Sequence, residues 1–335
     1  MLIVDGHLDL AMNALAGNRD LSVSAYTIRT HEFGSAGKGK AQGTVALPEM
    51  RQGRVALSFV TVVARSSGQV VPHIDFASPV QAYAVAQGQL AYYRALERWG
   101  HARVITGRAG LEQHLAEWEA WDAAAADGAS DTPPLGFIVL MECADPILRP
   151  AQLEAWWSSG LRMIGPAHFG PGRYAGGTGS ELGLNELGRE LLREMERLEL
   201  MLDLTHLSDE AFWEALDHFG GPVLASHSNS RVLVPNQRQF TDEQFLAIAE
   251  RDGVVGLLIG CSDLVPGWVV GARHNGHVTL HHLVDHIDYI CQLTGSARHV
   301  AIGSDLDGGV GRDEFPRDID TIADLQRLPA LLEQR

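Results

Sequence analysis

Eight short apolar runs, separated by amphipathic stretches, constrain the fold of this chain more than any other feature. Most of the runs are continuous rather than alternating, which is typical of strands buried on both faces of a parallel sheet. They cover residues 2–4, 55–63, 136–141, 161–164, 200–204, 222–225, 254–259 and 299–302. Parallel strands need long crossover connections, so strand and helix are expected to alternate along the chain.

The stretches between these runs have helical character. They cover residues 80–97, 110–126, 152–158, 185–197, 208–218, 241–251 and 279–293. Thr241 is followed three residues later by Gln244, the spacing of a capping box, and Asn185, Ser208 and Thr279 suit N-caps. The alternation predicts an α/β fold, a single (β/α)8 TIM-like barrel, which typically takes ~250 residues before insertions. A doubly wound open sheet is the alternative.

We expect residues 1–335 to form one barrel domain with two insertions. Residues 17–52 are rich in Gly, Ser and Arg without a period, and residues 123–134 are of low complexity. The sequence has no internal repeat and no linker that would divide it into two cores. A chain of this length can bury a large core, so it needs neither a disulfide nor a metal merely to fold.

The composition excludes several partners and compartments. The net charge of −16 argues against binding to nucleic acid or to an anionic membrane, because both require basic surfaces. The three cysteines, Cys143, Cys261 and Cys291, are far apart and are expected to be free thiols in a reducing compartment. No targeting or membrane-spanning run is visible, which predicts a soluble cytoplasmic protein.

Metal-binding residue types follow six of the eight runs. The active site of a (β/α)8 barrel lies at the carboxyl ends of its strands, so these residues are expected to meet there. They are His7, Asp9, Glu142, His168, His206, His227, Asp305 and Asp307. Imidazoles and carboxylates are zinc donors, and this set suffices for two ions with Glu142 as the bridging carboxylate.

Each of these residues, taken singly, has a structural alternative. His7 and Asp9 could be a surface histidine and a capping carboxylate, and Glu142 could cap its strand. The other histidines could be packed in loops, and Asp305 could cap its own loop. The combination favours the metal site. For Asp307 the capping role is preferred, with Asp305 pointing inward.

The joint pattern of these segments resembles the membrane (renal) dipeptidase family, metallopeptidases with an amidohydrolase-type barrel. The matching segments are residues 5–10, Glu142, and residues 203–208, 226–230 and 303–308, in the family's order over roughly residues 1–310. The resemblance implies roles for individual residues and a homodimer. By it, His7 and Asp9 bind one zinc, His206 and His227 bind the other, and Glu142 bridges the two. By the same resemblance, His168 contacts the substrate and stabilises the tetrahedral intermediate, Arg238 holds the substrate carboxylate, and Asp305 shuttles the proton.

The leading hypothesis is therefore a binuclear zinc dipeptidase that hydrolyses small dipeptides through a metal-bridging hydroxide. A related amidohydrolase acting on another small amide or a β-lactam-like substrate is the alternative, and a metal-poor barrel without catalysis is the third. Three features depart from the family pattern. Leu8 replaces the usual Asn, residues 165–174 are richer in Gly and Pro, and only 27 residues follow Gly308, which predicts a short last helix or a different closure. The side-chain and stereochemical preference for substrate is not readable from the sequence.

Two other motifs are interpreted as unrelated to function. Residues 34–40 have the spacing of a phosphate-binding loop, but Ala41 replaces the Mg²⁺-binding Ser/Thr and the flanking strand and helix are missing. A second motif is a group of five histidines at and inside one predicted helix, interpreted as a solvated face. They are His274, His277, His281, His282 and His286.

Overall fold

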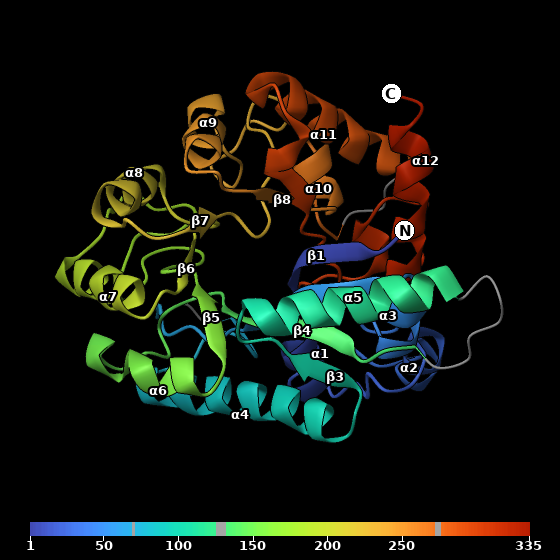
Figure 1. Ribbon diagram of the computed structural model, residues 1–335, viewed down its shortest axis with the longest axis horizontal. Helices are drawn as coiled ribbons and strands as arrows, with labels where there is room; N and C mark the ends of the chain where they lie inside the picture. The colour runs from blue at the N-terminus through green and yellow to red at the C-terminus, as the bar shows by residue number, and fades with distance from the viewer. Residues whose placement is uncertain (69–70, 125–131, 272–275) are drawn as a thin grey trace.

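The computed structural model describes residues 1–68, 71–124, 132–271 and 276–335. Eight parallel strands form a nearly closed barrel in the order β7-β6-β5-β4-β2-β1-β9-β8 (Figure 1). They are β1 Ile3–Leu8, β2 Val55–Val62, β4 Leu135–Met141, β5 Leu161–Ile164, β6 Met201–Asp203, β7 Val223–Leu224, β8 Val255–Leu257 and β9 Val300–Ile302. The predicted barrel architecture is confirmed. All seven residues of β4 and seven of the eight in β2 are buried, as expected for strands covered on both faces.

The barrel closes between β7 and β8 by a very short junction. Beyond the end of β7, Ala225 pairs with Val255 in an isolated parallel bridge. The amide of Ala225 donates to the carbonyl of Val254 at 3.0 Å, and the amide of Gly256 donates to the carbonyl of Ala225 at 2.8 Å. This seam holds far fewer ladder bonds than the β2–β4 pair, where six residue pairs are in register.

One strand of the sheet was not predicted from the sequence. β3, Ala102–Val104, pairs with the first three residues of β4, whereas β5 pairs with the last three, from Val139 to Met141. β4 therefore pairs with β3 at its start and with β5 at its end, both along the edge opposite β2. β3 is not one of the eight strands that form the barrel. Three residues are too few to show a period, so the sequence pattern could not distinguish this strand from a loop.

The outer helices agree with the predicted stretches to within about two residues. They are α4 Pro79–Arg98, α5 Arg108–Ala124, α6 Leu153–Ser158, α7 Glu186–Arg197, α8 Asp209–His218, α9 Asp242–Glu250 and α11 Leu280–Thr294, arranged around the strands (Figure 1). The capping box of Thr241 and Gln244 is present. Asn185 and Ser208 accept hydrogen bonds from the amides of Gly188 and Ala211, as N-caps do.

The first predicted insertion contains more structure than expected. Between β1 and β2 lie α1 Leu10–Leu15, α2 Ala25–His31 and α3 Leu47–Gln52. The side chain of Ser24 caps α2, and Pro48 stands in the first turn of α3, so both helices have local start signals despite their lack of a long period. In the second insertion, α5 ends at Ala124, and residues 125–131 lie outside the described residues.

The chain after β9 ends in short helical turns, as its length predicted. They are η4 Arg312–Glu314, η5 Ile322–Arg327 and α12 Leu328–Leu332. The remaining short elements are η2 Pro150–Gln152, α10 Cys261–Leu264 and η3 Ala297–His299. α12 packs on α11, and η5 packs on α3. The side-chain Nε2 of Gln326 donates to the carbonyl of Met1 at 3.0 Å, so this segment lies beside the start of β1.

Close packing at one end of the barrel is possible only because of glycine. A Cβ atom on Gly256 or Gly303 would overlap the carbonyl oxygen of Ser226, and one on Gly6 would lie 2.7 Å from it. Backbones from three strands thus pack directly around Ser226, which is buried. This packing fixes the backbone just before His227.

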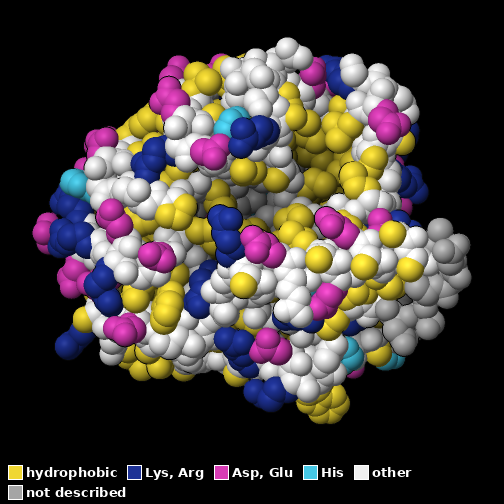
Figure 2. Space-filling view, viewed as in Figure 1, with side chains coloured by type: hydrophobic (Ala, Val, Ile, Leu, Met, Phe, Trp, Pro, Cys, Tyr) yellow, Lys and Arg dark blue, Asp and Glu magenta, His cyan; other side chains and the backbone are white. Residues whose placement is uncertain are grey.

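The surface carries charged side chains of both signs. Acidic and basic side chains are interspersed on the face shown in Figure 2, which is hollowed near its centre with hydrophobic side chains around the hollow. No helix among the described residues is both long and apolar enough to span a bilayer. Within the same residues, the three cysteines are free thiols, and Cys143 and Cys261 are buried.

Candidate metal centre

Four histidines converge on one carboxylate oxygen at the carboxyl ends of the strands. The Nε2 atoms of His168, His7, His206 and His227 lie 3.4, 3.6, 3.6 and 3.7 Å from Oε1 of Glu142. His7 belongs to β1, and the other residues follow β4, β5, β6 and β7. The barrel therefore brings together residues that are up to 220 positions apart in the sequence.

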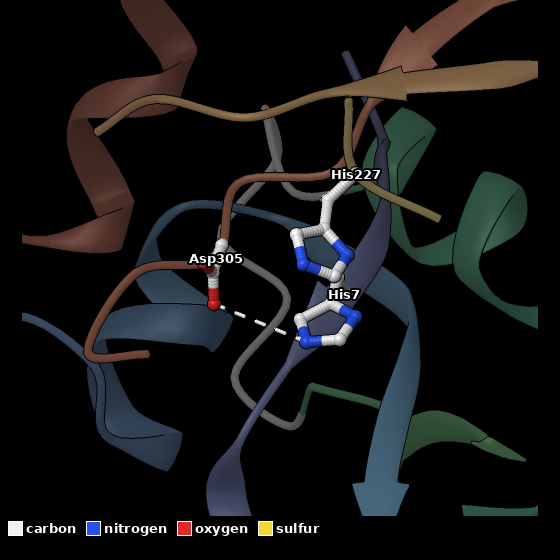
Figure 3. Close-up of side chains that lie close together, drawn as sticks. All are labelled: His7, His227 and Asp305. Carbon is white, nitrogen blue, oxygen red and sulfur yellow. Dashed lines mark ion pairs between the residues drawn. The ribbon is translucent and has the colours of Figure 1, made fainter. Parts of the chain in front are cut away.

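Three groups of these side chains have the spacing of metal ligands, with donor atoms within 4.8 Å of one another. They are Glu142 with His206 and His227, Asp9 with His7 and Glu142, and Asp305 with His7 and His227. Figure 3 shows the third group, in which the carboxylate of Asp305 points toward the ring of His7. The corresponding distance, from Asp305 Oδ1 to His7 Nε2, is 3.9 Å. All the metal ligands implied by the sequence lie in these groups, and Asp305 lies with them.

The shifted pKa values of the clustered side chains are consistent with a cation site. Burial lowers the pKa of His7, His206 and His227 well below the usual range, which leaves the imidazoles neutral. Burial also raises the pKa of Glu142 to about 8. A bound metal ion stabilises the ionised form of a buried carboxylate. It also binds the lone pair of a neutral imidazole nitrogen.

A buried atom without a partner supports the same conclusion. Among the described residues, His7 Nε2 is buried and has no hydrogen-bond partner, although Glu142, Asp9 and Asp305 lie 3.6–4.0 Å away. A nitrogen in this position costs free energy unless a ligand satisfies it. The residues present therefore fit a divalent metal.

Two buried aspartates hold the strand ends in register. Asp5 accepts hydrogen bonds from the amide of His7 at 3.1 Å and from the amide of Ser304 at 2.8 Å, so it joins β1 to the loop after β9. Asp203 accepts in the same way from the amide of Ser226 at 2.9 Å, joining β6 to the loop after β7. These carboxylates place the backbones of the candidate ligand residues, and they lie outside the three groups with metal-ligand spacing.

Three site residues have left-handed backbone conformations that non-glycine residues rarely adopt. The φ angles are 67° for His206, 52° for Asp305 and 66° for Asp307. Such conformations cost on the order of 1–3 kcal/mol each and persist where the surrounding contacts determine them. Their location at two strand ends turns the side chains of His206 and Asp305 back toward the barrel axis.

A single serine fixes the orientation of two imidazoles. Ser226 Oγ lies 3.2 Å from His7 Nδ1 and 2.8 Å from His227 Nδ1. The serine hydroxyl also bonds to the carboxylate of Asp203 and contacts Thr205 Oγ1 at 3.4 Å, and a hydroxyl that donates to either of them keeps its lone pairs for the two rings. Both histidines then carry their proton on Nδ1, and both Nε2 lone pairs face Glu142. This is the arrangement that metal-binding histidines require.

The third ligand histidine is held in the same way. Thr178 Oγ1 donates to the carbonyl of His206 at 3.2 Å and lies 3.2 Å from its Nδ1. A threonine hydroxyl that donates to this carbonyl accepts from Nδ1 of His206. Its Nε2 lone pair is therefore also free for a metal. Asp9 is held by the hydroxyl of Thr61 on β2.

The predicted substrate residues line one cavity with the metal centre. This cavity has a volume of about 1180 Å³, and its walls include Asp9, Glu142, His168, Arg238 and Asp305. Arg238 Nη1 donates to Ser228 Oγ at 3.1 Å. Its positive charge lowers the pKa of the buried imidazoles and opposes the rise for Glu142, which places the guanidinium near the centre. A cavity of this size is ample for a small peptide.

Asp307 has a structural role, as the sequence analysis preferred, but its carboxylate bonds to another segment rather than to its own loop. Its carboxylate accepts from the amides of Thr44 and Val45, at 2.8 and 3.1 Å, and lies 3.4 Å from Arg19 Nη1. It therefore ties the loop after β9 to the segment before α3. The neighbouring Asp305 instead faces His7, so two aspartates two positions apart have different surroundings.

The two motifs interpreted as unrelated to function have structural contacts. Lys40 Nζ pairs with Glu32 at 3.0 Å, and no helix follows the loop at residues 34–40, although residues 36–40 line the cavity. His282 accepts from the amide of Thr279 at 3.2 Å at the start of α11. The interpretation of a solvated face was wrong for His286, which is buried and accepts from the amide of Ser230 at 3.2 Å. His274 lies outside the described residues.

Sequence reasoning missed three residues that contact the site histidines. They are Ser226, Thr178 and Arg65, whose Nη1 lies 2.8 Å from His168 Nδ1. Arg65 was detectable, because it comes just after β2, but only metal-binding residue types were sought at the strand ends. Ser226 directly precedes His227, and hydroxyls next to ligand histidines are common partners of the second ring nitrogen.

Comparisons with known proteins agree with this geometry. The sequence profile of the membrane dipeptidase family, peptidase family M19, matches residues 1–335. The crystal structure of a metallopeptidase from Rhodobacter sphaeroides, liganded with a phosphinate mimic of the dipeptide L-Ala-D-Ala, is 26% identical in sequence. It superposes with a TM-score of 0.75, covering 100% of this chain and 93% of the other.

Curated relatives match over part of their length. A protein from the pqqA 5′ region of Klebsiella pneumoniae is 34% identical over 52% of this chain and 65% of its own. An uncharacterized dipeptidase from Schizosaccharomyces pombe is 30% identical over 56% of this chain and 44% of its own. The match to each of these two relatives thus spans less than two thirds of that relative's own length. The profile, which covers the whole chain, decides the assignment: the chain belongs to the membrane dipeptidase family, peptidase family M19.

Proposed function

We propose that this chain is a dipeptidase that uses two zinc ions. One ion would be held by His7, Asp9 and Glu142, and the other by Glu142, His206 and His227, so that Glu142 bridges them. The observation that carries the proposal is the position of Glu142 Oε1, which is 3.6–3.7 Å from Nε2 of all three ligand histidines. Imidazole and carboxylate ligands are typical of catalytic zinc.

The surrounding residues would supply the remaining chemistry. When bound, two zinc ions activate a water molecule and polarise the scissile carbonyl. Asp305 faces the space beside His7, where it can take the proton of the attacking water and deliver it to the leaving amine. His168 Nε2 lies 3.4 Å from Glu142 Oε1 and can donate a hydrogen bond to the oxygen of the tetrahedral intermediate.

Arg238 is proposed to bind the free carboxylate of the substrate. A hydrogen bond to a charged group contributes roughly 1.5–3 kcal/mol. Arg238→Met should therefore lower kcat/KM for a free dipeptide by about one to two orders of magnitude, since about 1.36 kcal/mol corresponds to tenfold. Turnover of C-terminally amidated dipeptides, already slow, should hardly change. The measurement is kcat/KM on each matched pair of substrates.

Arg238→Lys is the control for this experiment, because it keeps the charge but loses the planar guanidinium fork. It should retain part of the preference for the free carboxylate. Equal losses on free and amidated substrates would show that Arg238 supports the fold or the metals. Arg173, whose Nη2 donates to the carbonyl of Leu148 at 3.1 Å, would then be the next candidate.

The proposed function is tested by metal analysis combined with a substrate screen. The protein purified without chelator should contain about two zinc ions per chain. It should hydrolyse members of a dipeptide library that includes L,L and L,D pairs, and zinc should restore activity after chelation. Two zinc ions with activity only on other small amides or β-lactams would indicate a related amidohydrolase. At most one ion, with no activity on zinc addition, would indicate a barrel without this chemistry.

A further inference from the structure

We propose that Arg65 is a positioning residue that fixes His168 as a hydrogen-bond donor toward the reaction centre. The structural part of this inference concerns the tautomer of His168. Its catalytic consequence rests on the proposed dipeptidase function. Neither the metal ligands nor the substrate residues discussed above include Arg65.

The guanidinium of Arg65 is held in a rigid pocket between two segments. Nη1 lies 2.8 Å from Nδ1 of His168, and Nη2 lies 2.9 Å from Oδ2 of Asp75. The side chains of Arg65 and Asp75 are 4% and 0% exposed. The backbones of the two residues are also paired, because the amide of Arg65 donates to the carbonyl of Ile74 at 2.7 Å and the amide of Phe76 donates to the carbonyl of Arg65 at 2.8 Å. The guanidinium therefore has little freedom to leave His168.

The chemistry of the pair determines the tautomer. A guanidinium has five N–H donors and no acceptor, and it stays protonated in proteins. Nδ1 of His168 must therefore accept, and the single proton of the neutral ring must be on Nε2. That nitrogen lies 3.4 Å from Glu142 Oε1 and faces the cavity. His168 thus presents an N–H group to the site.

The other three histidines of the site have the opposite arrangement. Nδ1 of His7 and His227 bonds to Ser226 Oγ, and Nδ1 of His206 bonds to Thr178 Oγ1. A hydroxyl can accept a hydrogen bond from Nδ1–H, so these rings are able to present Nε2 lone pairs. A guanidinium cannot, so the fourth ring presents a proton. The group that bonds to Nδ1 therefore distinguishes the three proposed metal ligands from His168, the one hydrogen-bond donor of the cluster.

The expected consequence is a fixed donor for the negative oxygen that develops during amide hydrolysis. Removing one preorganised donor of this kind costs about 10²–10³ in kcat. Without Arg65, the ring of His168 could place its proton on Nδ1 and turn a lone pair toward the same oxygen. Substrate binding should be affected much less, since the interaction strengthens only as the charge forms.

The first experiment reads the tautomer directly. Zinc-loaded protein with ¹⁵N-labelled histidine rings is examined by NMR, and the His168 signals are assigned by their loss in His168→Gln. The wild-type protein should show the proton on Nε2 of His168. Arg65→Met combined with Asp75→Asn should shift that population, whereas Asp75→Asn alone should not. The double variant is used because removal of Arg65 alone would leave the buried Asp75 unpaired. A proton on Nδ1 in the wild-type protein would overturn the proposal, whatever the substrate.

The second experiment separates positioning from support of the fold. Relative to Asp75→Asn, the double variant should lose roughly 10²-fold in kcat, with zinc content and KM little changed. Arg65→Lys, which keeps a donor, should recover part of this loss. In a His168→Ala background, removal of Arg65 should cost nothing further, because the two residues act as one unit. An equal loss in both backgrounds would contradict the proposal. If no dipeptide is hydrolysed at all, the proposed function fails, while the NMR result still decides the tautomer.

Discussion

Glu142→Gln is expected to lose bound metal and activity together. The carboxylate oxygen lies within 3.7 Å of all three ligand histidines, so one substitution removes a charge from both proposed ion sites. Metal ions stabilise the transition state by several kcal/mol, and a loss of that size corresponds to a fall of about 10³-fold or more in kcat/KM. Elemental analysis and dipeptide hydrolysis on the same preparation measure both effects.

Glu154→Gln is a suitable control, because Glu154 is an exposed glutamate on α6 that pairs only with surface residues. It should retain both zinc ions and full turnover. Thermal unfolding of Glu142→Gln should show a folded barrel, since burial of the unbound carboxylate is unfavourable and the amide relieves it. A Glu142→Gln protein that retained two ions would contradict the bridging role.

Asp305→Asn is expected to keep metal and to lose turnover. A residue that moves a proton in the chemical step contributes about 10²–10⁴-fold to the rate. kcat should fall by that order, whereas zinc content and KM should change little, because an amide cannot take the proton from water. Asp305 Oδ1 lies 3.9 Å from Nε2 of His7, a proposed zinc ligand, so the test must also distinguish proton transfer from metal binding.

Zinc content decides between the two roles that this position allows. If Asp305→Asn loses an ion, Asp305 is a ligand in the group with His7 and His227, and the proton shuttle must be sought elsewhere. Asp313→Asn is the matched control, because Asp313 is an exposed aspartate after the same strand. That variant should behave as the wild-type protein does in both measurements.

The barrel and the residues that it gathers at its carboxyl end could be predicted because both depend on local patterns. Buried parallel strands read as continuous apolar runs, and the residue after each run is placed at the catalytic end by the fold. β3 and the helices α2 and α3 escaped this reasoning because they are too short to show a period. Their positions are fixed by packing against the barrel.

Contacts between distant residues could not be predicted from the sequence. Arg65 and His168 are 103 positions apart, and their hydrogen bond depends on how the segment that follows β2 folds back on itself. The same holds for Thr178 and His206, which lie in separate loops. Motifs identify which residues can bind a metal, but the side of each ring that carries the proton is decided by such contacts.

The seam between β7 and β8 links metal binding to the integrity of the barrel. His227 follows β7 on one side of this junction, and His7 belongs to β1, which is reached from β8 through β9 on the other side. A metal centre in which two ions share Glu142, as proposed, would connect His7 to His227 in a barrel whose β7–β8 and β1–β9 junctions each have a single residue pair in register. Its binding free energy then adds to the free energy of unfolding, by about 4.1 kcal/mol when the free ion is at 1,000 times its Kd. Metal binding at the proposed site would therefore also stabilise the closure of the barrel.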